Sequence, residues 1–150
     1  MSLDYSFEIS TKLSPESLMR IFLLSLGQSW NPNDGCEAHP GNLHAWVGPM
    51  PGGLSREIEL ERFGFDPNAY FVFNTWAAVS IEAREQIVRG TLAICRATTG
   101  DAVLLFNGEI ILFIRKAGTL YVNTAYWRGD YSLFPPPYEL KAFNVNDPAF

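Results

Sequence analysis

Alternating apolar and polar positions predict short strands along most of the chain. Tyr5, Phe7 and Ile9 alternate with polar neighbours, which is typical of a strand buried on one side. Later segments are short and either rich in aromatic and β-branched residues or alternate in the same way. The predicted strands are residues 4–10, 42–48, 56–65, 70–76, 102–106, 109–116 and 119–123.

Two segments have apolar residues at helical spacing instead. Residues 15–26 follow Ser14, which is a favourable helix N-cap. Residues 81–97 form the second predicted helix, with Ser80 as its N-cap. Gly90 lies in the interior of this helix, where glycine costs about 1 kcal/mol relative to alanine. We therefore expect another element to pack closely against Gly90.

The resulting order of elements is β-α-β-β-β-α-β-β-β. Grouped strands with two separated helices indicate an α+β fold, in which a mainly antiparallel sheet has both helices packed on one face. A chain of 150 residues can bury a core without disulfides or metals, and no segment resembles a linker between domains. We expect residues 1–150 to form a single domain.

The dipeptide Asn107-Gly108 predicts a two-residue hairpin turn, because both residues tolerate the positive φ that a type I′ turn needs. This turn pairs Leu105 with Ile110 and fixes which side chains share a face. One face is then aliphatic and suits the helices. The opposite face, called the second face below, has aromatic residues and polar tips, chiefly Leu104, Phe106, Ile111, Phe113 and Tyr121. Residues 70–76 divide similarly into Tyr70, Val72, Asn74 and Trp76 against Phe71, Phe73 and Thr75.

The second face needs a cover, since large apolar patches are rarely left bare on soluble monomers. One explanation is a C-terminal tail that folds back over it, with Phe134, Tyr138, Leu140 and Phe143. The other is a partner surface, because aromatic residues with polar tips are enriched in protein interfaces. That partner could be a second copy of the chain or a foreign protein.

Composition narrows the classes of partner and compartment. The net charge is -5 at pH 7, which argues against a nucleic-acid backbone or an anionic membrane as the main partner. Two cysteines suggest no disulfide framework, and the N-terminal segment is a strand pattern instead of a signal peptide. We expect a cytoplasmic protein.

A search for catalytic or metal-binding groups gives little. Cys36, His39 and His44 lie close together in "CEAHPGNLH", but their spacing matches no established zinc pattern. No stretch has the residues of a phosphate-binding loop, and no nucleophile and base pair stands out. We therefore expect no metal, no cofactor and no enzymatic activity.

Two polar clusters remain as candidates for partner binding. As strand residues, Glu57, Glu59 and Glu61 would share one face, either as a solvated acidic row or as a docking row for a basic partner. The second cluster follows the last predicted strand and has the composition of an interface hot spot. Its residues are Tyr126, Trp127, Arg128, Asp130 and Tyr131. The alternative is a structural role, in which Arg128 pairs with Asp130 at a turn and Trp127 caps the core.

Two stretches near the ends of the chain, "MSLDYSFEISTKLSPESLMRIFLLSLG" and "TGDAVLLFNGEIILFIRKAGTLYVN", share features with a known family. The "DY" strand, the "LSPE" helix start, the "LLFNGE" hairpin and the basic turn before "L-x-V-N" resemble the Sit-type (swarm-inhibition) immunity proteins of bacterial polymorphic toxin systems. Residues 30–78 have no counterpart in this resemblance. It implies a small cytoplasmic protein that binds and neutralises a cognate toxin, without catalysis or cofactor.

Three hypotheses follow from the sequence. The first is an immunity-type protein that binds a cognate toxin, and the acidic balance favours a basic surface on that toxin. The second is a small-ligand or enzyme domain with a pocket between the second face and the tail, using Asn74, Tyr121, Asn123 and Arg128 as polar groups. The third is a structural homodimer formed through the second face.

Overall fold

The computed structural model describes residues 2–76, 78, 80–145 and 147–150, which form an α+β fold built on one eight-stranded sheet. The strand order across the sheet is β2-β3-β4-β1-β5-β6-β7-β8, antiparallel except for the parallel β7–β8 pair. The strands are β1 (Ser2–Ile9), β2 (Glu37–Ala38), β3 (Leu43–Pro49), β4 (Ala69–Trp76), β5 (Ala102–Phe106), β6 (Ile110–Lys116), β7 (Thr119–Asn123) and β8 (Glu139–Lys141).

The described helices are α1 (Pro15–Ser25), α2 (Leu54–Phe63), α3 (Ser80–Ala97) and the short α4 (Thr124–Trp127), with a 3-10 turn at Pro32–Asp34. Both predicted helices are confirmed as α1 and α3. The Ser14 side chain caps α1 by accepting a hydrogen bond from the Ser17 N–H at 3.2 Å. Within the described residues, no helix is long and apolar enough to cross a bilayer.

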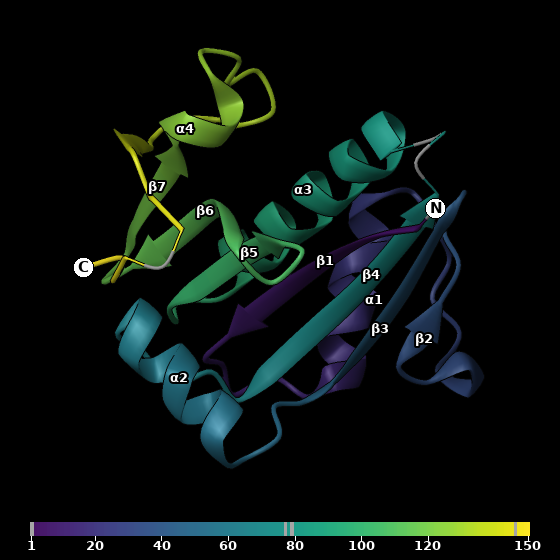
Figure 1. Cartoon of the computed structure of the whole chain (residues 1–150). Coiled ribbons are helices and arrows are strands. Elements are labelled where there is room, and N and C mark those ends of the chain that lie inside the picture. The colour runs from purple at the N-terminus through teal and green to yellow at the C-terminus, as the bar shows by residue number, and fades with distance from the viewer. Residues whose placement is uncertain (1, 77, 79, 146) are drawn as a thin grey trace.

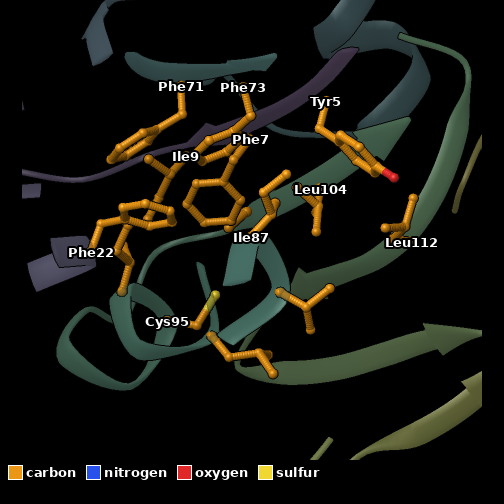
Figure 2. Packing of buried hydrophobic residues seen from close by; sticks show 14 of the residues in the cluster. Tyr5, Phe7, Ile9, Phe22, Phe71, Phe73, Ile87, Cys95, Leu104 and Leu112 are labelled. Atoms are coloured by element: carbon orange, nitrogen blue, oxygen red, sulfur yellow. The ribbon is translucent and has the colours of Figure 1, made fainter. Parts of the chain in front are cut away.

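The main core lies between the sheet and the pair α1 and α3, which pack against each other behind β1, β3 and β4 (Figure 1). Phe7 of β1 and Phe71 and Phe73 of β4 point toward the helices, and all three are fully buried. Phe22 of α1 meets this layer with its ring centroid 5.1 Å from that of Phe73 (Figure 2). The helix-facing layer on β1 and β4 is therefore aromatic, whereas the aliphatic face was predicted for the strands of residues 102–123.

The predicted strand at residues 56–65 is wrong, because this segment is the helix α2. Its alternating Glu and Ile or Leu residues suit a strand, but Ile58 and Leu60 are half-exposed and only Phe63 is fully buried. Gly64, at φ 75°, ends the helix in the left-handed conformation, and its N–H bonds back to the Leu60 carbonyl. A surface helix built from residues of high helix propensity can form with only a narrow buried edge, here provided by Phe63.

The predicted pairing of β5 with β6 is also wrong. Asn107 and Gly108 both have positive φ, as predicted, but the loop includes Glu109, so Phe106 faces Ile110. A bulge then shifts the register between Leu104 and Leu105. The predicted second face is divided: Leu104, Phe106 and Phe113 lie on the side of α1 and α3, and Ile111 and Tyr121 lie on the other. The longer loop moves Ile111, and Tyr121 lies on that side because it pairs with Ile114.

The sheet face opposite α1 and α3, to which the name second face refers from here on, is covered over β5, β6 and β7 by α2 and the C-terminal tail. Phe63 and Phe65 at the end of α2 pack with Val103 and Leu105 of β5. Phe143 and Ala149 of the tail complete this second cluster. The tail thus folds back over the sheet, as the first explanation predicted. Phe134 and Tyr138 pack with the main core, where the Phe134 ring centroid lies 6.0 Å from that of Phe113.

Gly90 confirms the expectation of close packing within α3. A Cβ atom built on it would lie 2.2 Å from Cδ2 and Cε2 of the Phe22 ring, well inside van der Waals contact. Gly90→Ala should therefore destabilise the protein by about 1–3 kcal/mol, although alanine is normally the better helix former. Urea unfolding followed by circular dichroism measures this change.

A double-mutant cycle with Phe22→Leu separates steric conflict from loss of helix propensity. The smaller Leu side chain leaves room for the new methyl group, so Gly90→Ala should cost at least about 1 kcal/mol less in the Phe22→Leu background. Additive effects of the two substitutions would contradict the packing described here.

Candidate functional site

The two halves of the sheet differ in whether their second face is covered or exposed to solvent. β5 and β6 are buried along almost their whole length. In β4, by contrast, buried and part-exposed residues alternate, as the sequence predicted, and β3 does the same over most of its length. The second face of β3, β4 and β1 is therefore open to solvent. We call it the open face, made of Asp4, Ser6, His44, Trp46, Tyr70, Val72, Asn74 and Trp76.

Aromatic side chains dominate the middle of the open face. The Trp46 ring lies over Gly48, where a Cβ atom would come within 2.4 Å of it. The same ring meets Tyr70 edge-on, with 5.2 Å between centroids. Trp76 at the end of β4 is 64% exposed. Large aromatic rings that project from a rigid sheet form a preorganised apolar surface.

Polar groups line the edge of the open face next to β2. His44 of β3 lies opposite Asn74 of β4, and the Asn74 Nδ2 atom is 3.4 Å from the His44 Nδ1 atom. On its other side, the His44 Nε2 atom is 2.6 Å from the Glu37 Oε1 atom. A cavity of about 350 Å³ opens beside these residues, lined also by Thr75 and Trp76.

A buried acidic group marks the boundary between the open and covered halves. Glu8 of β1 is only 6% exposed and lies beneath α2, near Glu59 and Arg62. Burial, and then the hydrogen bond and negative charge of Glu59, raise the pKa of Glu8 to about 9, against a smaller opposite effect of Arg62. Glu8 is thus protonated at neutral pH and contributes no negative charge to the surface.

The structure does not bring the three predicted acidic residues together on one face. On the helix α2, Glu57 and Glu61 are one turn apart and exposed, whereas Glu59 is part-buried beside Glu8. Glu57 and Glu61 are bordered by Leu54 and Ile58, which are 71% and 52% exposed. The predicted acidic row is therefore a pair.

The predicted cluster after the last strand has mainly structural contacts. Trp127 is buried, and its indole N–H donates to the Leu112 carbonyl at 3.0 Å, so it caps the core. Arg84 of α3 binds the Tyr126 hydroxyl at 3.2 Å. Asp130 accepts hydrogen bonds from Ser132, and no ion pair joins it to Arg128 in the described part of the chain. Tyr131 packs near Tyr138, and Arg128 is exposed.

Most of the residues predicted on the second face are inaccessible. Leu104 and Phe113 are fully buried in the main core, and Ile111 is buried under the tail. Phe106 and Tyr121 are part-exposed.

Asn123, one of the polar groups suggested for a ligand pocket, is already engaged. Its amide donates to Ile111 and accepts from the N–H groups of Ala125 and Phe143. It therefore fixes α4 and the tail to the sheet.

Neither cysteine has the features of a nucleophile. Cys95 is buried in α3, and burial raises the pKa of its thiol to about 11. Partial burial and the Glu16 carboxylate raise the pKa of the Cys36 thiol. Reactive cysteines instead have a lowered pKa and lie near positive charge.

One comparison with known proteins assigns the chain to a family. Residues 3–130 match the model of the SitI3-like family. The chain belongs to the SitI3-like family. This match confirms the resemblance to Sit-type immunity proteins and extends through residues 30–78, which the resemblance left out. No curated protein and no solved structure matches the chain.

The family name points to an immunity protein, and so to a non-enzymatic role with a toxin as partner. The SitI3-like chain presents uncovered aromatic side chains on the open face, which the sequence analysis did not select as a site. The available signal was the division of residues 70–76, which separates Tyr70 and Trp76 from Phe71 and Phe73. The sequence did not indicate that α2 and the tail cover only the half of the sheet formed by β5, β6 and β7.

Proposed function

We propose that this SitI3-like protein neutralises a cognate toxin in the bacterial cytoplasm by direct, non-catalytic binding. Family membership supports the class of partner. The open face supports the surface, because Trp46, Tyr70 and Trp76 form an aromatic centre that the chain's other elements leave uncovered. Interfaces of this kind derive most of their affinity from such aromatic residues.

The charge of the protein favours a toxin with a basic rim around its contact surface. The net charge is -5, and exposed Asp4 and Glu37 border the aromatic centre. Complementary charge raises association rates and selects the correct partner. The pair Glu57 and Glu61 on α2 would extend this acidic rim toward the covered half of the sheet.

Substitutions on the open face test this proposal. Trp46→Ala and Trp76→Ala should each reduce affinity for the toxin encoded by the neighbouring gene by about 30-fold or more, the loss typical of a hot spot. Binding by isothermal titration and survival of cells that co-express toxin and variant measure the effect. Leu24→Ala is the matched control, because Leu24 is 55% exposed on α1, on the opposite side of the sheet.

Three outcomes would contradict the proposal. Cells that express the wild-type protein with the toxin could die as fast as cells with the toxin alone. Both tryptophan variants could bind as tightly as Leu24→Ala. Light scattering could also show a dimer of the 16.8 kDa chain that Trp46→Ala converts to a monomer, which would assign the open face to a second copy.

A further inference from the structure

Two histidines and one glutamate converge at the edge of the sheet. Glu37 lies on β2, His44 on β3, and His39 in the turn between the two strands. One ligand atom from each lies within 4.8 Å of the others. The imidazole rings of His39 and His44 are stacked, with 4.6 Å between their centroids.

The pairing of β2 with β3 explains why these side chains meet. Glu37 lies opposite Trp46, so its side chain shares the open face with Trp46 and His44. The turn after Ala38 contains Pro40 and Gly41, and it returns the chain so that His39 stacks on His44. The β2–β3 hairpin therefore brings the three side chains together, although their spacing along the chain matches no established zinc motif.

Glu37 and His44 are joined by a hydrogen bond, and His39 lies near enough for side-chain rotation to bring all three groups onto one metal ion. The Glu37 Oε1 atom is 2.6 Å from His44 Nε2 and 4.0 Å from His39 Nε2. The longer separation is outside hydrogen-bond range. Tetrahedral Zn²⁺ with ligands at 2.0–2.1 Å separates neighbouring ligand atoms by about 3.3 Å, between the two observed values. Small side-chain rotations would equalise them.

The surroundings supply two further features of a metal site. The Asn74 Nδ2 atom lies 3.4 Å from the Nδ1 atom of His44. With the amide turned over so that Oδ1 faces the ring, Asn74 accepts the proton of Nδ1–H, fixes the ring and leaves Nε2 free for the metal. The cavity of about 350 Å³ beside the histidines leaves a coordination position accessible to water. No lysine or arginine is among the described residues that line it.

We propose that Glu37, His39 and His44 bind Zn²⁺, with a water molecule as fourth ligand on the side of the cavity. Two imidazoles and one carboxylate are a ligand set that suits this ion. Cys36, which the sequence analysis grouped with the histidines, takes no part: its sulfur lies 3.6 Å from the Glu16 Oε1 atom. The ion would cross-link β2, the turn and β3 at one end of the open face. This site does not depend on toxin binding.

Titration of the metal-free full chain with ZnCl₂ at pH 7.5 tests the proposal. Calorimetry should show one Zn²⁺ per chain with a dissociation constant of about 10 µM or tighter. The unfolding midpoint should rise with Zn²⁺ concentration, since the ion binds only the folded hairpin. Co²⁺ in the same site should give the visible absorption bands of a tetrahedral complex.

Four variants locate the ion. His39→Ala and His44→Ala should each weaken Zn²⁺ binding at least tenfold, and Asn74→Ala about tenfold through the orientation of His44. Cys36→Ser should bind as tightly as wild type. The His39 side chain is 71% exposed, so its removal leaves folding intact. Binding weaker than 10 µM in the wild type would overturn the site, as would His39→Ala with wild-type affinity or loss of binding in Cys36→Ser.

Discussion

Replacing Arg115 with methionine should lower the free energy of unfolding by about 3–5 kcal/mol, although Arg115 touches no acidic residue in the described chain. Its guanidinium lies at the C-terminal end of α3, only 8% exposed. Nε donates to the Gly100 carbonyl at 2.8 Å, and Nη1 donates to the carbonyls of Thr98, at 3.0 Å, and Cys95.

Cys95 lies in the last turn of α3, and the last four carbonyl groups of any helix lack an intrahelical donor. Thr98 and Gly100 follow the helix, in the loop before β5, so all three carbonyls need a partner from outside the helix. Arg115 satisfies them, and its positive charge complements the negative end of the helix dipole. Methionine keeps the apolar stem but leaves the carbonyls buried and unpaired. Arg115→Lys keeps the charge but not the planar set of donors, so it should recover less than half of the loss.

Arg96→Met is the matched control, because Arg96 lies in the last turn of the same helix but is exposed. We expect it to change stability by less than about 0.5 kcal/mol. Urea unfolding of the three variants gives the comparison. A free energy of unfolding of Arg115→Met within 1 kcal/mol of the wild-type value would contradict this prediction. It would show that water can hydrogen-bond to the carbonyls in place of the guanidinium.

The parts of the fold that the sequence predicted correctly are those with strong local signals. Ser14 and Pro15 define the start of α1, and the alternation in β4 separates Phe71 and Phe73 from the solvent side. Each signal depends on one face being buried and the other solvated. The open face could be predicted for the same reason, since its strands face water on one side.

The wrong predictions concern strands that are buried on both faces and a helix that buries only a narrow edge of its surface. β5 and β6 are apolar on both sides, so periodicity does not indicate which residues face the helices. The three-residue loop after Phe106 moves Ile110 and Ile111 to the faces opposite those predicted relative to β5, and the bulge opposite Leu104 and Leu105 restores the predicted faces from Phe113 onward. Neither feature leaves a mark in a single sequence. In α2, Phe63 is the one fully buried side chain among those described, and its burial determines which side of the helix faces the sheet.

The histidine–glutamate cluster shows a third kind of limit. Cys36 and the two histidines are close in sequence, but the structure groups the histidines with Glu37 and turns Cys36 toward Glu16. Cys36 precedes β2 and packs against the main core, whereas Glu37 is exposed on the open face, so the two side chains diverge. Only knowledge of the two-residue strand β2 would have separated them.

The largest pH effect should come from Glu8. Its folded-state pKa is about 9, raised first by burial and then by Glu59, against an ordinary value of 4.5. Between these two values, the unfolded chain loses a proton that the folded protein keeps. Stability should therefore be fully present below pH 4.5 and fall as the pH rises toward 9, by up to about 1.4 kcal/mol per pH unit from this group.

Glu8→Gln should remove this part of the pH dependence, because glutamine resembles the protonated acid but cannot ionise. We expect the variant to gain about 2–4 kcal/mol relative to wild type between pH 4.5 and pH 8. Glu59→Gln should flatten the profile less, since it removes the neighbouring charge but leaves Glu8 buried. Urea unfolding at one-unit pH intervals measures all three profiles.

Glu57→Gln separates the buried acid from the general charge of α2. Glu57 is exposed on the outer side of the helix, so its removal should leave the pH profile parallel to that of wild type. Parallel profiles for Glu8→Gln and wild type would mean that water reaches Glu8 and that it ionises normally. Because Glu8 lies where α2 meets the sheet, a flattened profile would also show that keeping α2 on the second face requires one neutral carboxyl group.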